Sequence, residues 1–200
     1  MGIPKEIKEI FTYEDYCSWP DDERWELIEG IPYDMSPAPV RKHQKISRIL
    51  STAIDTFLSG KSCEMYSAPF DVLLPAANDQ PVSEIQTVVQ PDISVICDKS
   101  KLTDAGCTGA PDLIVEILSP STAKKDMDEK FHLYEKHGVR EYWVVDPGSE
   151  YIRVFVPDEN KKYGQGELFS LTDKSSSGTI AGSAVLEGFG IALSDLFGEE

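Results

Sequence analysis

The 200-residue sequence has no apolar stretch long enough to suggest a membrane helix. No hydrophobic run approaches the roughly 18 residues expected of a transmembrane span. The first 16 residues, MGIPKEIKEIFTYEDY, carry charges throughout and lack the apolar centre of a secretory signal. We therefore expect a cytoplasmic protein that does not bind a membrane, folded as one domain over residues 1–200.

Cysteine and histidine are scarce and are not spaced as metal ligands. The four cysteines (Cys17, Cys63, Cys97 and Cys107) include no Cys-x-x-Cys pair, and there are only three histidines. This pattern argues against a structural zinc site and predicts free thiols in a reducing compartment. A Gly-x-Ser-x-Gly elbow, a P-loop and a dinucleotide-binding fingerprint are also missing, so the enzyme classes that depend on these motifs are not indicated.

Positive charge is in short supply. Nineteen Lys and Arg residues face 35 Asp and Glu residues, which gives a formal net charge of −16. Binding of nucleic acid through bulk electrostatics is disfavoured, because counterion release requires many cationic side chains at phosphates. A cleft that meets DNA or RNA through a local basic patch and a bound metal remains compatible with this charge.

Hydrophobic periodicity predicts a mixed α/β (α+β) domain with a central sheet and a helix on each side. Apolar residues from Ile46 to Leu58 have helical spacing and stop at Gly60, and a second long helix is expected over residues 123–138. Strands are expected over residues 63–75, 87–97 and 111–119. Two hairpins are expected, one at Glu29-Gly30 and one at Asp146-Pro147-Gly148.

Two acidic residues lie within apolar strands and require an explanation. Asp92 lies in VVQPDISVI and Glu116 in DLIVEIL. A buried, unpaired carboxylate is costly, so such a group usually has a cation, a proton or a metal as partner. The two strands follow each other along the chain and are expected to pair about 4.8 Å apart. Asp92 and Glu116 could then share Mg²⁺ or Mn²⁺, which prefer oxygen ligands.

The helix after Glu116 offers a cation. Asp126, Lys130 and Tyr134 follow each other at intervals of four residues and therefore lie along one stripe of the helix. If the helix returns towards the strand end, Lys130 leans over Glu116.

Structural explanations of the same residues stay open. Lys130 could form a purely structural ion pair with the strand acid, or it could be solvated like most lysines. His43, near the start of the long helix, is expected to face solvent unless it belongs to a site. Asp112 follows Pro111 at a strand start and is expected to accept hydrogen bonds from a turn.

Several segments, taken together, resemble the Uma-type restriction endonuclease family within the PD-(D/E)XK nuclease superfamily. They run in the family's order over nearly all 200 residues. They are WELIEGIPYDMSP, RKHQKIS, QPDISVI, GAPDLIVEILSPST, DMDEKFHLYEKHGVREYWVVDP and LEGFGIALSDLF. The resemblance implies a restriction-endonuclease-like core, a mixed sheet flanked by helices with additional β-hairpins, in a bacterial nuclease.

The resemblance also implies roles for individual residues. Asp92 and Glu116 would bind Mg²⁺. The superfamily's lysine normally follows the second acid by two positions, where this chain has Leu118, so Lys130 on the next helix becomes the candidate. His43 would be an auxiliary polar residue of the first core helix, and Glu26 would approach the same cleft.

The leading hypothesis is a Mg²⁺- or Mn²⁺-dependent nuclease that acts on nucleic acid, with DNA favoured over RNA. The alternative is a catalytically inactive nuclease fold that serves as a binding module, with a structural Asp/Glu–Lys cluster. A small-nucleotide phosphoesterase is a third hypothesis. A homodimer is compatible with a nuclease that cuts two strands, although no heptad pattern points to it.

Overall fold

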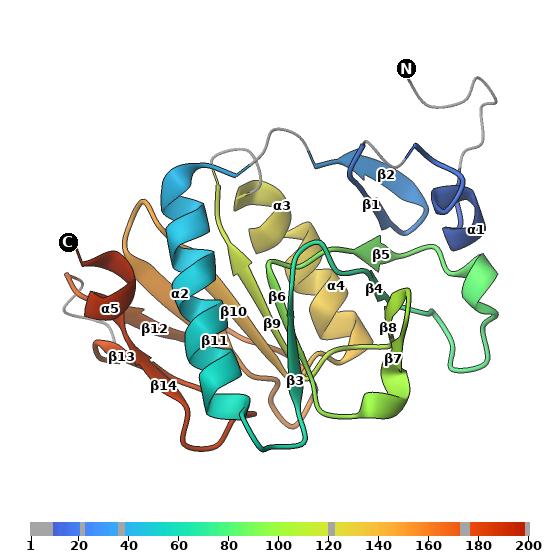
Figure 1. Cartoon of the computed structure of the whole chain (residues 1–200). Coiled ribbons are helices and arrows are strands. Elements are labelled where there is room, and N and C mark those ends of the chain that lie inside the picture. Colours follow the sequence, from blue (N-terminus) through green and yellow to red (C-terminus); the bar gives the residue numbers. More distant parts are fainter. Residues whose placement is uncertain (1–9, 21–22, 36–38, 120–122, 173–176, 199–200) are drawn as a thin grey trace.

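The computed structural model describes residues 10–20, 23–35, 39–119, 123–172 and 177–198, with helices packed against two main sheets (Figure 1). The α-helices are α1 (Tyr13–Tyr16), α2 (Arg41–Leu58), α3 (Ala123–Met127), α4 (Glu129–His137) and α5 (Leu193–Phe197). Short 3₁₀ helices are η1 (Val82–Glu84) and η2 (Lys99–Lys101). Within these described residues, none of the helices has the length and apolarity needed to cross a membrane.

The central sheet has six strands in the order β12-β11-β10-β9-β6-β3. These strands are β3 (Glu64–Ser67), β6 (Ile93–Ile96), β9 (Leu113–Ile117), β10 (Glu141–Asp146), β11 (Tyr151–Phe155) and β12 (Glu167–Ser170). Strands β9 and β10 run parallel, whereas the other neighbours are antiparallel. The α3–α4 segment provides the crossover that a parallel pair requires.

Helices cover both faces of the central sheet (Figure 1). Ile46, Leu50 and Ile54 of α2 pack with Val115 and Ile117 of β9 on one face. Leu133 and Tyr134 of α4 pack on the other face, with Ile114 and Leu118. Because side chains alternate along a strand, Glu116 shares the α4 face with Ile114 and Leu118. The mixed α/β fold predicted from the sequence is confirmed.

A second six-stranded sheet, in the order β2-β1-β5-β4-β8-β7, lies beside the central one. Its strands are β1 (Trp25–Ile28), β2 (Ile31–Asp34), β4 (Val72–Leu73), β5 (Val88–Val89), β7 (Leu102–Thr103) and β8 (Gly106–Thr108). The hairpin predicted at Glu29-Gly30 joins β1 to β2, and both turn residues have positive φ. Strands β13 (Ile180–Gly182) and β14 (Gly190–Ala192) form a separate pair.

Two segments predicted as single strands are divided between the sheets. Residues 63–75 supply β3 to the central sheet and β4 to the second, with Pro69 between them. Residues 87–97 are divided in the same way into β5 and β6, around Pro91. Proline has no N–H to donate to a ladder, so a strand tends to start or end near it.

The helix predicted over residues 123–138 is also divided. It breaks at Asp128, whose φ and ψ of −125° and −74° are not helical, so that α3 and α4 are separate. Gly138 ends α4 in the left-handed conformation with φ +77°, in agreement with its predicted position. Ser121 and Thr122, which precede α3 in the sequence, lie outside the described residues.

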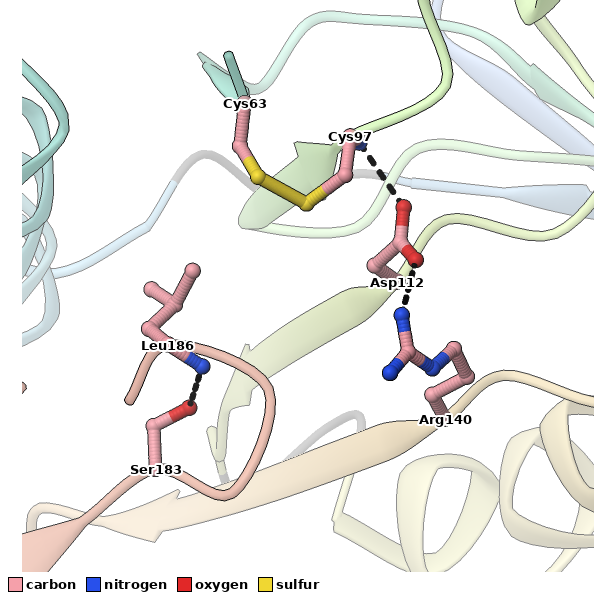
Figure 2. Close-up of a disulfide and its surroundings, with 6 residues drawn as sticks. All are labelled: Cys63, Cys97, Asp112, Arg140, Ser183 and Leu186. Carbon is pink, nitrogen blue, oxygen red and sulfur yellow. Dashed lines mark hydrogen bonds and ion pairs between the residues drawn. A yellow bond between two sulfur atoms is a disulfide. The ribbon is translucent and has the colours of Figure 1, made fainter. Parts of the chain in front are cut away.

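The prediction that all four cysteines are free thiols was wrong for two of them. Figure 2 shows a disulfide between Cys63 and Cys97, with an Sγ–Sγ distance of 2.07 Å. Antiparallel pairing of Glu64 with Ile96 brings the two adjoining cysteines opposite each other. The spacing of the cysteines alone could not show this, because it depends on the register of β3 and β6. Cys17 and Cys107 are free.

Candidate active site

Asp92 and Glu116 lie on neighbouring strands of the central sheet. Asp92 directly precedes β6, and Glu116 lies in β9; the antiparallel pairing of these strands places Ile93 opposite Val115. Asp92 Oδ2 accepts a hydrogen bond from the Ile117 N–H at 2.7 Å, so its carboxylate lies against the β9 backbone next to Glu116. The Asp92 side chain is 19% exposed and that of Glu116 is 5% exposed. Asp92 thus lies towards solvent and Glu116 lies deeper.

Helix α4 supplies two donors to the buried Glu116. Lys130 Nζ lies 2.8 Å from Glu116 Oε1, and the Tyr134 hydroxyl donates to the same oxygen at 2.7 Å. Asp126 Oδ1 of α3 is 3.8 Å from Lys130 Nζ, and the Tyr142 hydroxyl donates to the Asp126 carbonyl. The stripe of Asp126, Lys130 and Tyr134 therefore faces Glu116, despite the break between α3 and α4.

Glu26 connects this cluster to the second sheet. It lies in β1 and is fully buried. Its Oε1 accepts from Lys130 Nζ at 2.7 Å and from the Gln90 N–H at 3.0 Å. Its Oε2 accepts from Lys125 Nζ at 2.7 Å. A continuous chain of contacts therefore runs from Lys125 through Glu26 and Lys130 to Glu116.

Burial and charge act on the two glutamates with opposite results. Burial disfavours ionisation of Glu26, but Lys130 and Lys125 outweigh it and lower the pKa of Glu26 to about 2. Burial raises the pKa of Glu116 to about 8, because Lys130 offsets it only in part and Asp126 adds to it. The pKa of Lys130 is raised well above its usual value, since its carboxylate neighbours outweigh its burial. Burial thus opposes ionisation of Glu116, whereas the two lysines favour ionisation of Glu26.

His43 is buried, unlike the solvent-facing histidine expected outside a site. It lies in the first turn of α2, with Nε2 3.2 Å from Asp92 Oδ2. Burial would lower the pKa of His43, but its hydrogen bond to Asp92 and the charge of that carboxylate raise it. Among the described residues, its Nδ1 has no hydrogen-bond partner. His43 therefore belongs to the same site as Asp92.

Leu118 and Asp112 flank the two ends of β9 and have partners outside the cluster around Glu116. Leu118, which the sequence resemblance aligns with the superfamily lysine, is 9% exposed and packs in the apolar cluster with Leu133. Asp112, at the opposite end of β9, accepts the Cys97 N–H at 2.8 Å and pairs with Arg140 at 2.8 Å (Figure 2).

The donor set suits a hard divalent cation held by few protein ligands. Asp92 uses Oδ2 for His43 and the Ile117 N–H, and Glu116 uses Oε1 for Lys130 and Tyr134. A metal would therefore be held by Oδ1 of Asp92 and Oε2 of Glu116. In the part of the chain that is described, no three His, Cys, Asp or Glu side chains are grouped to hold a metal. Two carboxylates still fit Mg²⁺, which usually keeps several waters and takes one or two carboxylates.

Sequence reasoning missed Lys125 as a member of the cluster. It follows Lys124 on a predicted helix, and such a pair is typical of a solvated surface. The one available signal was Glu26 in the apolar stretch WELI, because a buried acid there needs a partner. That signal does not say which lysine supplies it.

The chain is similar to known proteins over most of its length. The chain is 30% identical over 145 residues to the uncharacterized protein slr1290 of Synechocystis sp., covering 71% of this chain and 72% of that protein. Its fold matches the crystal structure of a putative nuclease belonging to DUF820 from Anabaena variabilis, with a TM-score of 0.71 and 20% identity, over 94% of this chain and 97% of that one. The model of the Uma2 family, described as "Putative restriction endonuclease", matches residues 13–194. The chain therefore belongs to the Uma2 family.

Proposed function

We propose that this protein is a Mg²⁺- or Mn²⁺-dependent endonuclease of the PD-(D/E)XK type that hydrolyses phosphodiester bonds in nucleic acid, with DNA as the favoured substrate. The observation that carries the proposal is the convergence of Asp92, Glu116 and Lys130 on adjacent elements, with Asp92 partly open to solvent. Membership of the Uma2 family, whose description is "Putative restriction endonuclease", supports it.

In the proposed reaction, a water oxygen forms a bond to phosphorus and one bridging P–O bond breaks. The products are a phosphomonoester and an alcohol, whose oxygen takes up a proton. A divalent cation bound by Asp92 and Glu116 would stabilise the developing negative charge and favour ionisation of the water.

The protein's own groups would hold this arrangement in place. Lys130 and Tyr134 fix the orientation of Glu116 through Oε1. His43 and the Ile117 N–H fix Asp92 through Oδ2. His43 would also contact the substrate or a water near Asp92. Such preorganisation matters because the charges then need not reorganise during reaction.

The test is cleavage of plasmid, single-stranded DNA and RNA by the purified protein in Mg²⁺ or Mn²⁺. The Asp92→Asn and Glu116→Gln variants should lose cleavage of whichever substrate is cut. Asp112→Asn is the matched control, because Asp112 is an acid of the same strand region held by Cys97 and Arg140 away from Glu116. Cleavage that survives in Glu116→Gln at the wild-type rate would refute the assignment.

The second candidate function is a nuclease fold that binds a partner without catalysis. The 2.8 Å contact between Lys130 and Glu116 favours it, because an ion pair can satisfy a buried acid without any metal. The net charge of −16 also disfavours unassisted approach to DNA. Calorimetric titration with Mg²⁺ separates the two: binding that disappears in Asp92→Asn supports the nuclease, and no binding supports the module.

Size-exclusion chromatography with light scattering would test the homodimer that a two-strand cut suggests.

A further inference from the structure

Two lysines share the carboxylate of Glu26 but differ in their surroundings. Lys125 Nζ and Lys130 Nζ each lie 2.7 Å from one of its oxygens. The Lys130 side chain is 3% exposed, whereas that of Lys125 is 16% exposed. The two ammonium groups are therefore the inner and outer members of one cluster.

Lys130 is buried among three carboxylates. Its ammonium contacts Glu26 and Glu116 at 2.7 and 2.8 Å, and Asp126 lies 3.8 Å away. Reaching a phosphate would break one of these buried contacts and leave a buried carboxylate without its cation, which is strongly unfavourable. Its position suits a group that fixes two carboxylates, and not one that meets an incoming anion.

Lys125 retains donors. An ammonium carries three N–H groups, and among the described residues the hydrogen-bonding partner of Lys125 is Glu26. Its Nζ also lies 5.2 Å from the centroid of the Tyr33 ring. Because α3 holds Lys125 at the more open side of the cluster, its remaining N–H groups are available to a ligand from solvent.

We propose that Lys125, and not Lys130, is the cation that donates hydrogen bonds to a non-bridging oxygen of the substrate phosphate, while Lys130 is a positioning residue for Glu116 and Glu26. The inference rests on the proposed nuclease function and assigns the phosphate contact of that site. In this role Lys125 donates hydrogen bonds and transfers no proton. Glu26 serves as the anchor that directs the Lys125 side chain.

The first experiment compares Lys125→Met with Lys125→Arg and the control Lys136→Met, each in the full chain. Lys136 of α4 pairs with Glu29 in an exposed position and lies outside the cluster. On the DNA that wild type cuts, Lys125→Met should lower kcat about 100- to 1,000-fold, as loss of one donor to a developing charge does. Lys125→Arg should recover part of this loss, and Lys136→Met should cut at the wild-type rate.

The second experiment measures binding of a DNA duplex, with Ca²⁺ replacing Mg²⁺, by fluorescence anisotropy over a range of salt. Loss of one phosphate contact should reduce the slope of log K against log salt by about 0.9 in Lys125→Met. A lysine that only neutralises Glu26 would change stability and leave this slope unchanged. An unchanged slope, or a kcat for Lys125→Met within about threefold of wild type, would overturn the inference.

A third measurement separates this inference from the proposed function. Inorganic phosphate is titrated into protein with ¹⁵N-labelled lysine, and the Lys125 ammonium resonance, assigned from Lys125→Arg, is followed by NMR. A saturable shift supports an anion site at Lys125, whether or not the wild-type protein acts on nucleic acid. If the wild-type protein neither cuts nor binds nucleic acid, the proposed nuclease function is refuted. No shift in a protein that cuts DNA would refute the inference alone.

Discussion

Replacement of Lys130 by Met removes a buried charge while keeping a side chain of similar length. Glu26 then loses one of its two lysines, and Glu116 keeps the Tyr134 hydroxyl as its donor among the described residues. The lysines lower the pKa of Glu26 from 4.5 to about 2, a change worth about 3 kcal/mol. Breaking one partner of a buried ion pair typically costs about 3–5 kcal/mol. We therefore expect Lys130→Met to lower the free energy of unfolding by about 3 kcal/mol at pH 7.

The assay is urea unfolding followed by tryptophan fluorescence, to which Trp143, fully buried in the native state, contributes. Lys136→Met is the matched control, because Lys136 lies on the same helix and pairs with Glu29 at 2.6 Å, with both side chains about 60% exposed. Exposed pairs contribute about 0–1 kcal/mol. The comparison isolates the effect of burial on an ion pair of nearly the same length.

The pH dependence provides an independent check. The pKa of Glu26 is lower in the folded state than in the unfolded state, so its ionisation stabilises the fold fully above about pH 4.5. This stabilisation is lost as the pH falls towards 2. The difference between wild type and Lys130→Met should therefore be full at pH 7, decline below about pH 4.5 and be small near pH 2. A loss below 1 kcal/mol at pH 7, or one that does not shrink with acid, would refute the reasoning.

Three further predictions follow from other contacts. Cys63→Ser should lower the free energy of unfolding by about 4 kcal/mol, because the disulfide closes a loop with a sequence separation of 34, and reductant should abolish the difference from wild type. Gly106→Ala should destabilise by about 1–3 kcal/mol in thermal unfolding, since φ is +138° and the added Cβ would collide with the Asp71 carbonyl; an unchanged melting temperature would contradict this. Tyr134→Phe should cost about 1–3 kcal/mol in urea, because it removes a buried donor from Glu116, and equal midpoints would show that the hydrogen bond contributes nothing.

Much of the local structure could be predicted from the sequence. Helical spacing from Ile46 to Leu58 predicted α2, and Gly138 ends α4 as predicted. The adjacency of the strands bearing Asp92 and Glu116 followed from their order along the chain, and β6 and β9 do pair. The breaks near Pro69 and Asp128 were missed, because a periodic pattern continues through a residue that interrupts the backbone hydrogen bonds.

The candidate site also has a part that the sequence could predict and a part that it could not. Local spacing placed Asp126, Lys130 and Tyr134 on one stripe, and Lys130 is within 2.8 Å of Glu116. The burial of His43 and the pairing of Lys125 with Glu26, 99 residues apart, could not be read from spacing. They depend on how α2 packs on the central sheet and how β1 packs against α3.

The sequence by itself determined the periodic elements and the two acids that apolar strands would bury, because side-chain spacing and the cost of burying charge act locally. Only the tertiary structure decided which cations those acids meet. Several lysines can satisfy the charge of Glu26, and the choice of Lys125 and Lys130 comes from the packing of the two sheets around α3 and α4. The Cys63–Cys97 disulfide was decided in the same way, by the register of β3 against β6.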